Sequence, residues 1–273
     1  GYGIESHIVN GNNILDVYTK ISSVAAKIRK KPKPVLIEFK TFRLRGHEEA
    51  SGVKYVPKEL ISEWKEKDPI SNYESFLIES KLLTKDDIVE IRNKFTKEIT
   101  RNLELAFNEP LLKPDINTEL KEVYKEHLFK QVRHSKKTSN LRFIDAISDG
   151  LFQSMEKNNN LILMGQDIAE YGGVFKVTEG FAKKFGAERV RNTPICESAI
   201  IEVAMGLSIC NTKSIVELQF SDFITSGFNP VVNYLAKSYY RWGQNADIVL
   251  RMPCGAGVGA GPFHSQTNEA WFT

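Results

Sequence analysis

The sequence predicts an α/β protein with two parallel-sheet segments that are joined by a partly helical linker. Two stretches alternate short apolar runs with amphipathic helices, which is the pattern of parallel sheets. The stretch between them has little strand character and ends in a polar run. We therefore expect a first segment over residues 1–108, a linker over 109–140 and a second segment over 141–273.

The first segment begins with a strand, a helix and a strand. Residues 4–9 can form a strand, and Asn12 or Asn13 can cap a helix over 14–28, where apolar residues recur at helical spacing. The nearly continuous apolar run at 35–39 predicts a second strand that is covered on both faces. This order makes one βαβ unit, which implies parallel strands.

Three further helices are expected before the linker. A short helix runs from Pro57 through Trp64, and another covers about 70–82. Thr84 with Asp87 three residues later forms a capping signal for a long helix to about Phe107. This part of the first segment is therefore expected to be helical.

The second segment alternates strands and helices again. The predicted strands lie at 161–164, near Val190, at 215–220 and at 247–251. The predicted helices lie at 141–157, from a Thr178 cap to Phe185, at 197–210 and at 228–241. A glycine-rich loop follows at 254–266, and we expect this segment to be cut short at its C-terminus.

The composition excludes several classes of protein. Hydrophobic residues make up 41% of the 273 residues, which is enough for a core and argues against a disordered chain. The net charge of +3 is too small to indicate a nucleic-acid or membrane partner. The three cysteines form no C-x-x-C pair, and no apolar run could span a bilayer. A reducing cytoplasm is the expected location.

Glu197 and His264 are candidate functional residues of the second segment. Glu197 lies at a predicted helix start, where a carboxylate is stabilised by the helix dipole. The helix is small and apolar, so Glu197 can alternatively be buried and carry a proton. His264 ends the glycine-rich run 255–261, which is either a tight structural loop or a place where a ligand approaches the backbone.

His47 is the candidate of the first segment, directly after a predicted strand. Its loop is either a polar surface loop or a site for an anionic ligand. Arg43 and Arg45 can bind such a ligand or pair with Glu48 and Glu49. No metal-ligand spacing and no G-x-S-x-G elbow occurs in the sequence.

Taken together, these motifs resemble one family, the thiamin-diphosphate-dependent 2-oxo acid dehydrogenases, in their first, decarboxylating component. Stretches similar to the C-terminal half of the α subunit lie at 2–13 (Y-G-I-E-S-H-I-V-N-G-N-N), 35–47 and 55–69. Stretches similar to the first part of the β subunit lie at 164–180, 185–198, 216–223 (V-E-L-Q-F-S-D-F) and 261–266 (G-P-F-H-S-Q). This order resembles the fused α/β form found among bacterial members.

The resemblance implies two incomplete thiamin-diphosphate-binding, transketolase-like domains. Glu197 matches the glutamate that hydrogen-bonds the aminopyrimidine ring, and Gln219 and Phe223 match positions that line the pyrimidine pocket. His264 matches the β-subunit histidine implicated in proton transfer during reductive acylation. His47 matches the α-subunit loop histidine near the diphosphate and the lipoyl entrance.

The resemblance also implies a reaction and partners. The reaction is oxidative decarboxylation of a 2-oxo acid, with a branched-chain acid slightly preferred, followed by reductive acylation of a lipoyl group on a partner acyltransferase. The fused chain would form a homodimer equivalent to an α2β2 tetramer. The alternatives are a pyruvate or acetoin dehydrogenase component, a transketolase-like transferase, and a non-catalytic scaffold that docks the acyltransferase.

The sequence departs from the family pattern in two places. Glu48 follows His47 where animal enzymes have a phosphorylatable serine, so kinase control at that position is not expected. The G-D-G and N-N motif that holds the diphosphate through Mg²⁺ is absent. We therefore expect these residues to be a fragment, with metal ligands outside it and no activity on its own.

Overall fold

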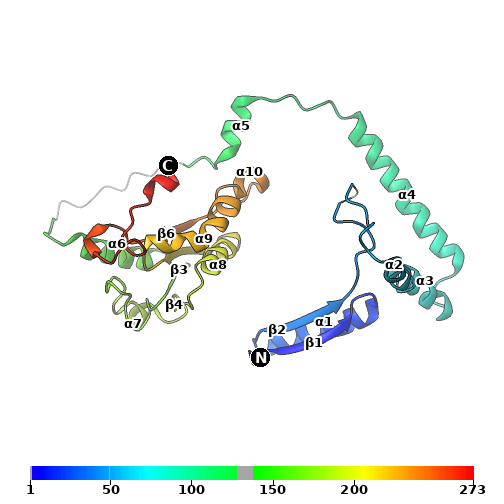
Figure 1. Ribbon diagram of the computed structural model, residues 1–273, viewed down its shortest axis with the longest axis horizontal. Helices are drawn as coiled ribbons and strands as arrows, with labels where there is room; N and C mark the ends of the chain where they lie inside the picture. Colours follow the sequence, from blue (N-terminus) through cyan, green and yellow to red (C-terminus); the bar gives the residue numbers. More distant parts are fainter. Residues whose placement is uncertain (1, 49, 128–137) are drawn as a thin grey trace. The chain divides into compact units, whose positions relative to one another are not determined.

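The computed structural model describes residues 2–48, 50–127 and 138–273. The chain divides into two compact units, residues 1–111 and residues 112–273 (Figure 1). Both units contain parallel strands and helices, as the sequence predicts.

Unit 1 opens with the predicted βαβ unit. Strands β1 (Glu5–Asn10) and β2 (Val35–Lys40) pair in parallel, and helix α1 (Ile14–Lys30) connects them. Asn13 caps α1, because its side-chain oxygen accepts the backbone N–H of Leu15 at 3.1 Å. The βαβ prediction is therefore confirmed.

Only one face of the two-stranded sheet in unit 1 is covered. Val9 of β1 and Val24 of α1 are buried. On the opposite face Ile8 is 71% exposed and Leu36 is 64% exposed. The prediction that residues 35–39 are covered on both faces is wrong for this unit, because burial alternates along both strands.

Three helices complete unit 1: α2 (Lys58–Glu66), α3 (Pro69–Glu79) and α4 (Lys85–Asn108). The expected capping box is present, since Asp87 donates its backbone N–H to the Thr84 hydroxyl and its carboxylate accepts the Thr84 N–H.

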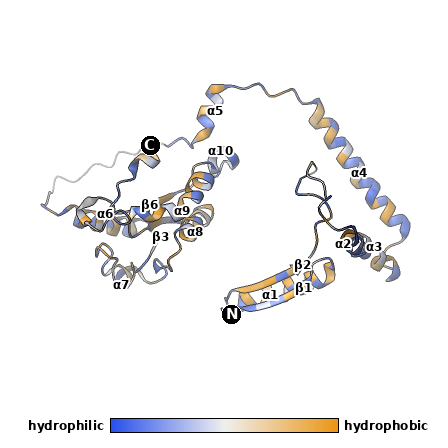
Figure 2. Ribbon diagram, in the orientation of Figure 1, coloured by the Kyte–Doolittle hydropathy of each residue, from blue (hydrophilic) through white to orange (hydrophobic). Residues whose placement is uncertain are grey.

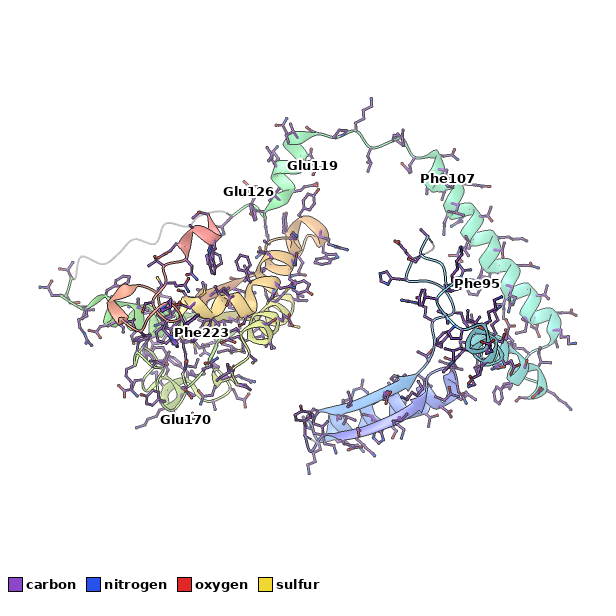
Figure 3. The ribbon with its side chains drawn as sticks, viewed as in Figure 1. Phe95, Phe107, Glu119, Glu126, Glu170 and Phe223 are labelled. Atoms are coloured by element: carbon purple, nitrogen blue, oxygen red, sulfur yellow. The ribbon has the colours of Figure 1, made fainter. Side chains whose placement is uncertain are left out.

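The long helix α4 contains no buried residue, and all of its residues belong to the described part of the chain. The ribbon of this helix alternates between residues coloured hydrophobic and residues coloured hydrophilic (Figure 2). Phe95 is 59% exposed and Phe107 is 84% exposed (Figure 3). The capping signal and helical periodicity therefore define α4, whereas burial within unit 1 contributes little to it.

Unit 2 begins with α5 (Ile116–Val123), which lies within the predicted linker. The Tyr240 hydroxyl donates a hydrogen bond of 2.9 Å to Glu119 of this helix, and that bond raises the pKa of Tyr240. Residues 128–137 of the predicted linker lie outside the described residues, and they include His134. Helix α5 is thus attached to the second unit.

A four-stranded parallel sheet forms the centre of unit 2. Its strand order is β4-β3-β5-β6. The bounds are β3 (Leu161–Gly165), β4 (Val190–Asn192), β5 (Lys213–Glu217) and β6 (Ile248–Arg251). The helices are α6 (Phe143–Lys157), α7 (Phe181–Phe185), α8 (Glu197–Ile209), α9 (Ile224–Pro230) and α10 (Ser238–Trp242).

Two hydrophobic clusters cover the two faces of this sheet. Leu163 and Ile215 belong to the cluster that contains Met155 of α6. Their chain neighbours Met164 and Val216 belong to the cluster that contains Ile201 of α8. Since successive residues of a strand point to opposite faces, helices cover both sides of the sheet.

Two predicted elements of unit 2 have different bounds in the structure. Strand β5 ends at Glu217, so the predicted strand at 215–220 is too long. The predicted helix at 228–241 is replaced by α9, a π-helical turn (Val231–Leu235) and α10. Pro230, which has no N–H to donate, lies where the α-helical pattern changes.

The Thr178 cap is also a wrong prediction. Helix α7 follows Gly180, and no side chain caps it. Thr178 is instead fully buried, and its hydroxyl donates a 2.7 Å hydrogen bond to the carbonyl oxygen of Ile168. The buried hydroxyl therefore closes the loop between β3 and α7.

A core substitution in α8 should destabilise unit 2. Ile201 is 0% exposed, so Ile201→Ala leaves a cavity and is expected to lower the free energy of unfolding by about 2–5 kcal/mol. Val203→Ala on the same helix is the control, because Val203 is 53% exposed. Urea unfolding followed by circular dichroism measures both. Equal losses would contradict the assigned core.

The carboxyl of Glu5 should titrate at unusually low pH. Its hydrogen bond to Lys33, with a second one to His7, lowers its pKa from 4.5 to about 2. The stability that this group contributes is therefore present above pH 4.5 and is lost as the pH falls through about 2.

Substitution of the lysine tests this cause. Carbon-detected NMR titration should show the Glu5 midpoint rising toward 4.5 in Lys33→Met. Lys40→Met is the control, because Lys40 contacts Glu38 instead. A Glu5 midpoint that stays the same in Lys33→Met would show that the ion pair does not cause the shift.

Candidate active site

The ends of three neighbouring strands define one edge of the sheet in unit 2. Gly165 of β3 is in register with Glu217 of β5, and Glu217 is in register with Arg251 of β6. Ligand sites of open parallel sheets lie beyond this carboxyl edge. The loop after β3 carries Gln166, and the loop after β5 carries Gln219. The loop after β6 (residues 252–268) carries His264 and is called the His264 loop.

A buried ion pair joins two of these strand ends. The Arg251 guanidinium lies 2.7 Å from the Glu217 carboxylate, and their side chains are 15% and 7% exposed. Burial raises the pKa of Glu217, and the Arg251 charge opposes that rise. Glycines permit the close packing here. A Cβ on Gly165 would lie 2.7 Å from the Glu217 carbonyl oxygen, and one on Gly173 would lie 3.3 Å from its carboxylate.

Glu197 is the first residue of α8 and is buried, with 9% exposure. The carboxylate thus lies at a helix N-terminus, as the first alternative expects, and is also shielded from water, which the second alternative requires. The side-chain amide of Gln166 lies 3.4 Å from the Glu197 carboxylate. Gln166 was missed by the sequence reasoning, although its position directly after β3 is a signal that could have found it.

His264 belongs to a cluster of four rings. Its imidazole ring lies 5.0 Å from the Phe220 ring and 5.3 Å from the Phe223 ring, both nearly edge-on. Phe175, from the loop after β3, contacts Phe220 at 5.8 Å. The structure thus brings His264 and Phe223 together. Phe223 is labelled in Figure 3. Phe175 and Phe220 were missed, because no local pattern links them to His264.

The remaining candidates occupy different places. Gln219 is half-buried, two residues beyond the end of β5. His47 belongs to unit 1, in an exposed loop that follows β2. Glu49, a possible partner of the loop arginines, lies outside the described residues. Glu197, Gln219, Phe223 and His264 therefore share unit 2, and His47 does not.

The described residues offer neither a metal cluster nor a membrane-spanning helix. Those residues contain no group of three or more His, Cys, Asp or Glu side chains that could hold a metal ion. None of their helices has the length and apolar character that crossing a membrane requires. The three cysteines are free thiols.

Two family models match the chain one after the other. Residues 1–115 match the dehydrogenase E1 component family. Residues 139–273 match the transketolase pyrimidine-binding domain family. Each unit of the structure therefore corresponds mainly to one family model.

Curated relatives match about half of the chain. A 2-oxoisovalerate dehydrogenase subunit beta of Bacillus subtilis is 40% identical over 134 residues, or 48% of this chain and 41% of the relative. A 3-methyl-2-oxobutanoate dehydrogenase subunit beta of Mycobacterium tuberculosis is 38% identical over 137 residues, which are 50% of this chain and 39% of the relative. A pyruvate dehydrogenase E1 component subunit beta of Acholeplasma laidlawii is 40% identical over 134 residues, which are 48% of this chain and 41% of the relative.

The chain thus spans about two fifths of the length of these relatives. The relatives and the dehydrogenase E1 model both point to 2-oxo acid dehydrogenases. The chain is similar to the thiamin-diphosphate-dependent 2-oxo acid dehydrogenases, with a dehydrogenase E1 segment followed by a transketolase-type pyrimidine-binding domain.

Proposed function

We propose that this chain is part of an enzyme that decarboxylates a 2-oxo acid with thiamin diphosphate and passes the acyl group to a lipoyl group. The observation that carries this proposal is Glu197, a buried carboxylate at the start of α8. The family matches supply the reaction class.

Glu197, its neighbour Gln166 and two further residues of unit 2 are proposed to bind the pyrimidine end of the cofactor. The 3.4 Å contact from Gln166 is long, so the Glu197 carboxyl group can form a further and shorter hydrogen bond with the aminopyrimidine ring. Phe223 offers an aromatic surface in the same unit. Gln219, which like Phe223 follows strand β5, offers a polar group. Thiamin diphosphate, when bound, supplies the electron sink that decarboxylation needs.

The diphosphate end depends on other residues. A diphosphate is usually held through Mg²⁺ by oxygen ligands. The described residues contain no cluster of His, Cys, Asp or Glu side chains for such an ion. His47, in its exposed loop after β2, is proposed to lie near the diphosphate and the path of the lipoyl group.

His264 is proposed to transfer a proton during acylation of the lipoyl group. Its ring is half-buried and is held edge-on by two phenylalanines, so its orientation is restricted while part of it reaches solvent. Imidazole can gain or lose a proton near neutral pH, which suits this role.

The relatives support a proposal for the substrate, whereas the proposed partner and assembly rest on the family resemblance. Two of the relatives are named after one branched-chain acid, 2-oxoisovalerate, whose other name is 3-methyl-2-oxobutanoate, and this favours a branched-chain 2-oxo acid over pyruvate or acetoin. The proposed partner is a lipoyl-bearing acyltransferase. The proposed assembly is a cytoplasmic homodimer, equivalent to an α2β2 tetramer.

Replacement of Glu197 tests the catalytic proposal. In the full-length protein, Glu197→Gln should lower turnover about 100-fold or more, because the proton-accepting carboxylate is lost. Glu202→Gln is the matched control, since Glu202 is exposed on the same helix. Oxidation of 2-oxo acids in the presence of a lipoyl domain is the assay. Unchanged turnover in Glu197→Gln would favour a scaffold, and activity on sugar phosphates instead would favour a transketolase-like transferase.

Replacement of His264 separates the two halves of the reaction. His264→Ala should reduce acylation of a lipoyl domain about 100-fold, whereas decarboxylation with an artificial electron acceptor should fall much less. His127→Ala is the control, because His127 is exposed and outside the proposed site. Equal losses in both assays would argue against a role of His264 that is specific to acylation.

A further inference from the structure

The turn η1 (Ser221–Phe223) is bonded to the His264 loop at several points. The Ser221 backbone N–H donates to the carbonyl oxygen of Pro253 at 2.8 Å, near the start of the loop. At its far end, the Asn268 side chain donates to the carbonyl oxygen of Ser221 at 3.0 Å. Both ends of the loop are therefore attached to one residue of the turn.

Gln266, two residues beyond His264, is held through both its backbone N–H and its backbone carbonyl oxygen. Its backbone N–H donates to the Asp222 carboxylate at 3.3 Å. Its carbonyl oxygen accepts the Ser221 hydroxyl at 3.4 Å. Phe220 and Phe223, which flank these two residues in the sequence, contact the His264 ring. One short segment thus fixes both the backbone and the ring.

Asp222 is the unusual member of this segment. It is buried, with 7% exposure. One of its carboxylate oxygens, Oδ1, accepts the Gln266 N–H. The other, Oδ2, is buried and has no hydrogen-bond partner among the described residues. Burying a carboxylate is costly, and the Gln266 N–H is the hydrogen-bond donor that offsets part of this cost.

We propose that Asp222 is a positioning residue for His264. Its carboxylate fixes the backbone at Gln266, so the loop presents the imidazole ring against Phe220 and Phe223 in one orientation. A fixed ring lowers the entropic cost of aligning a proton donor with the lipoyl group. The part of this proposal that concerns acylation rests on the proposed function, and the part that concerns the loop does not.

Hydrogen–deuterium exchange of the full-length protein tests the loop directly. In Asp222→Ala, the Gln266 amide should exchange about 10-fold faster, because its acceptor is lost. In Asp222→Asn, which keeps an oxygen at this position, exchange should stay within about twofold of the wild type. Asp149→Ala is the control, because Asp149 contacts Gln153 on the surface of α6. Equal exchange rates in all four proteins would overturn the proposal.

Kinetics then tests the consequence for His264. Asp222→Ala should lower acylation of a lipoyl domain about 10-fold, with decarboxylation measured by an artificial electron acceptor within about threefold of the wild type. Asp222→Asn should restore acylation. Parallel losses in both assays, without rescue by the asparagine, would show a general structural defect and overturn the positioning role.

A second variant covers the case in which Asp222→Ala does not fold. Ser221→Ala removes the hydroxyl bond to Gln266 alone and should raise exchange of the peptide 260–268 about threefold, with a matching loss of acylation. No change in either measurement would overturn the proposal. If the wild-type protein itself decarboxylates no 2-oxo acid, the proposed function fails, whereas the exchange data still decide whether Asp222 holds the loop.

Discussion

The buried ion pair between Glu217 and Arg251 fixes the edge on which the candidate site depends. Loss of either partner would leave the other charge without its counter-charge, so the pair reinforces the register in which the β5–β6 ladder places these strand ends. Close packing of Gly165 against Glu217 then aligns β3 with them. The three loops that carry Gln166, Phe220 and His264 leave from this one line of strand ends.

Local sequence patterns predicted the elements that local forces determine. Helical periodicity and the Asn13 and Thr84 caps defined α1 and α4, and apolar runs defined the strands. The apolar character of the helix after residue 196 correctly indicated that Glu197 can be buried. Each of these features depends on residues within one or two turns of the chain.

Features that depend on contacts between distant residues could not be predicted in this way. Strand β5 ends at Glu217, although apolar residues continue beyond it, because the chain turns at Ser221 toward Pro253. Thr178 is a residue type that often caps helices, but its buried hydroxyl donates a hydrogen bond to the carbonyl oxygen of Ile168 instead. The contacts of Phe220 with His264 and of Asp222 with Gln266 join residues that are more than 40 positions apart.

The tandem order of the two family segments has a consequence for assembly. Residues 1–115 and 139–273 are made by one ribosome in equal number, so their stoichiometry needs no separate regulation. Each segment is therefore supplied to any larger assembly in a fixed one-to-one ratio.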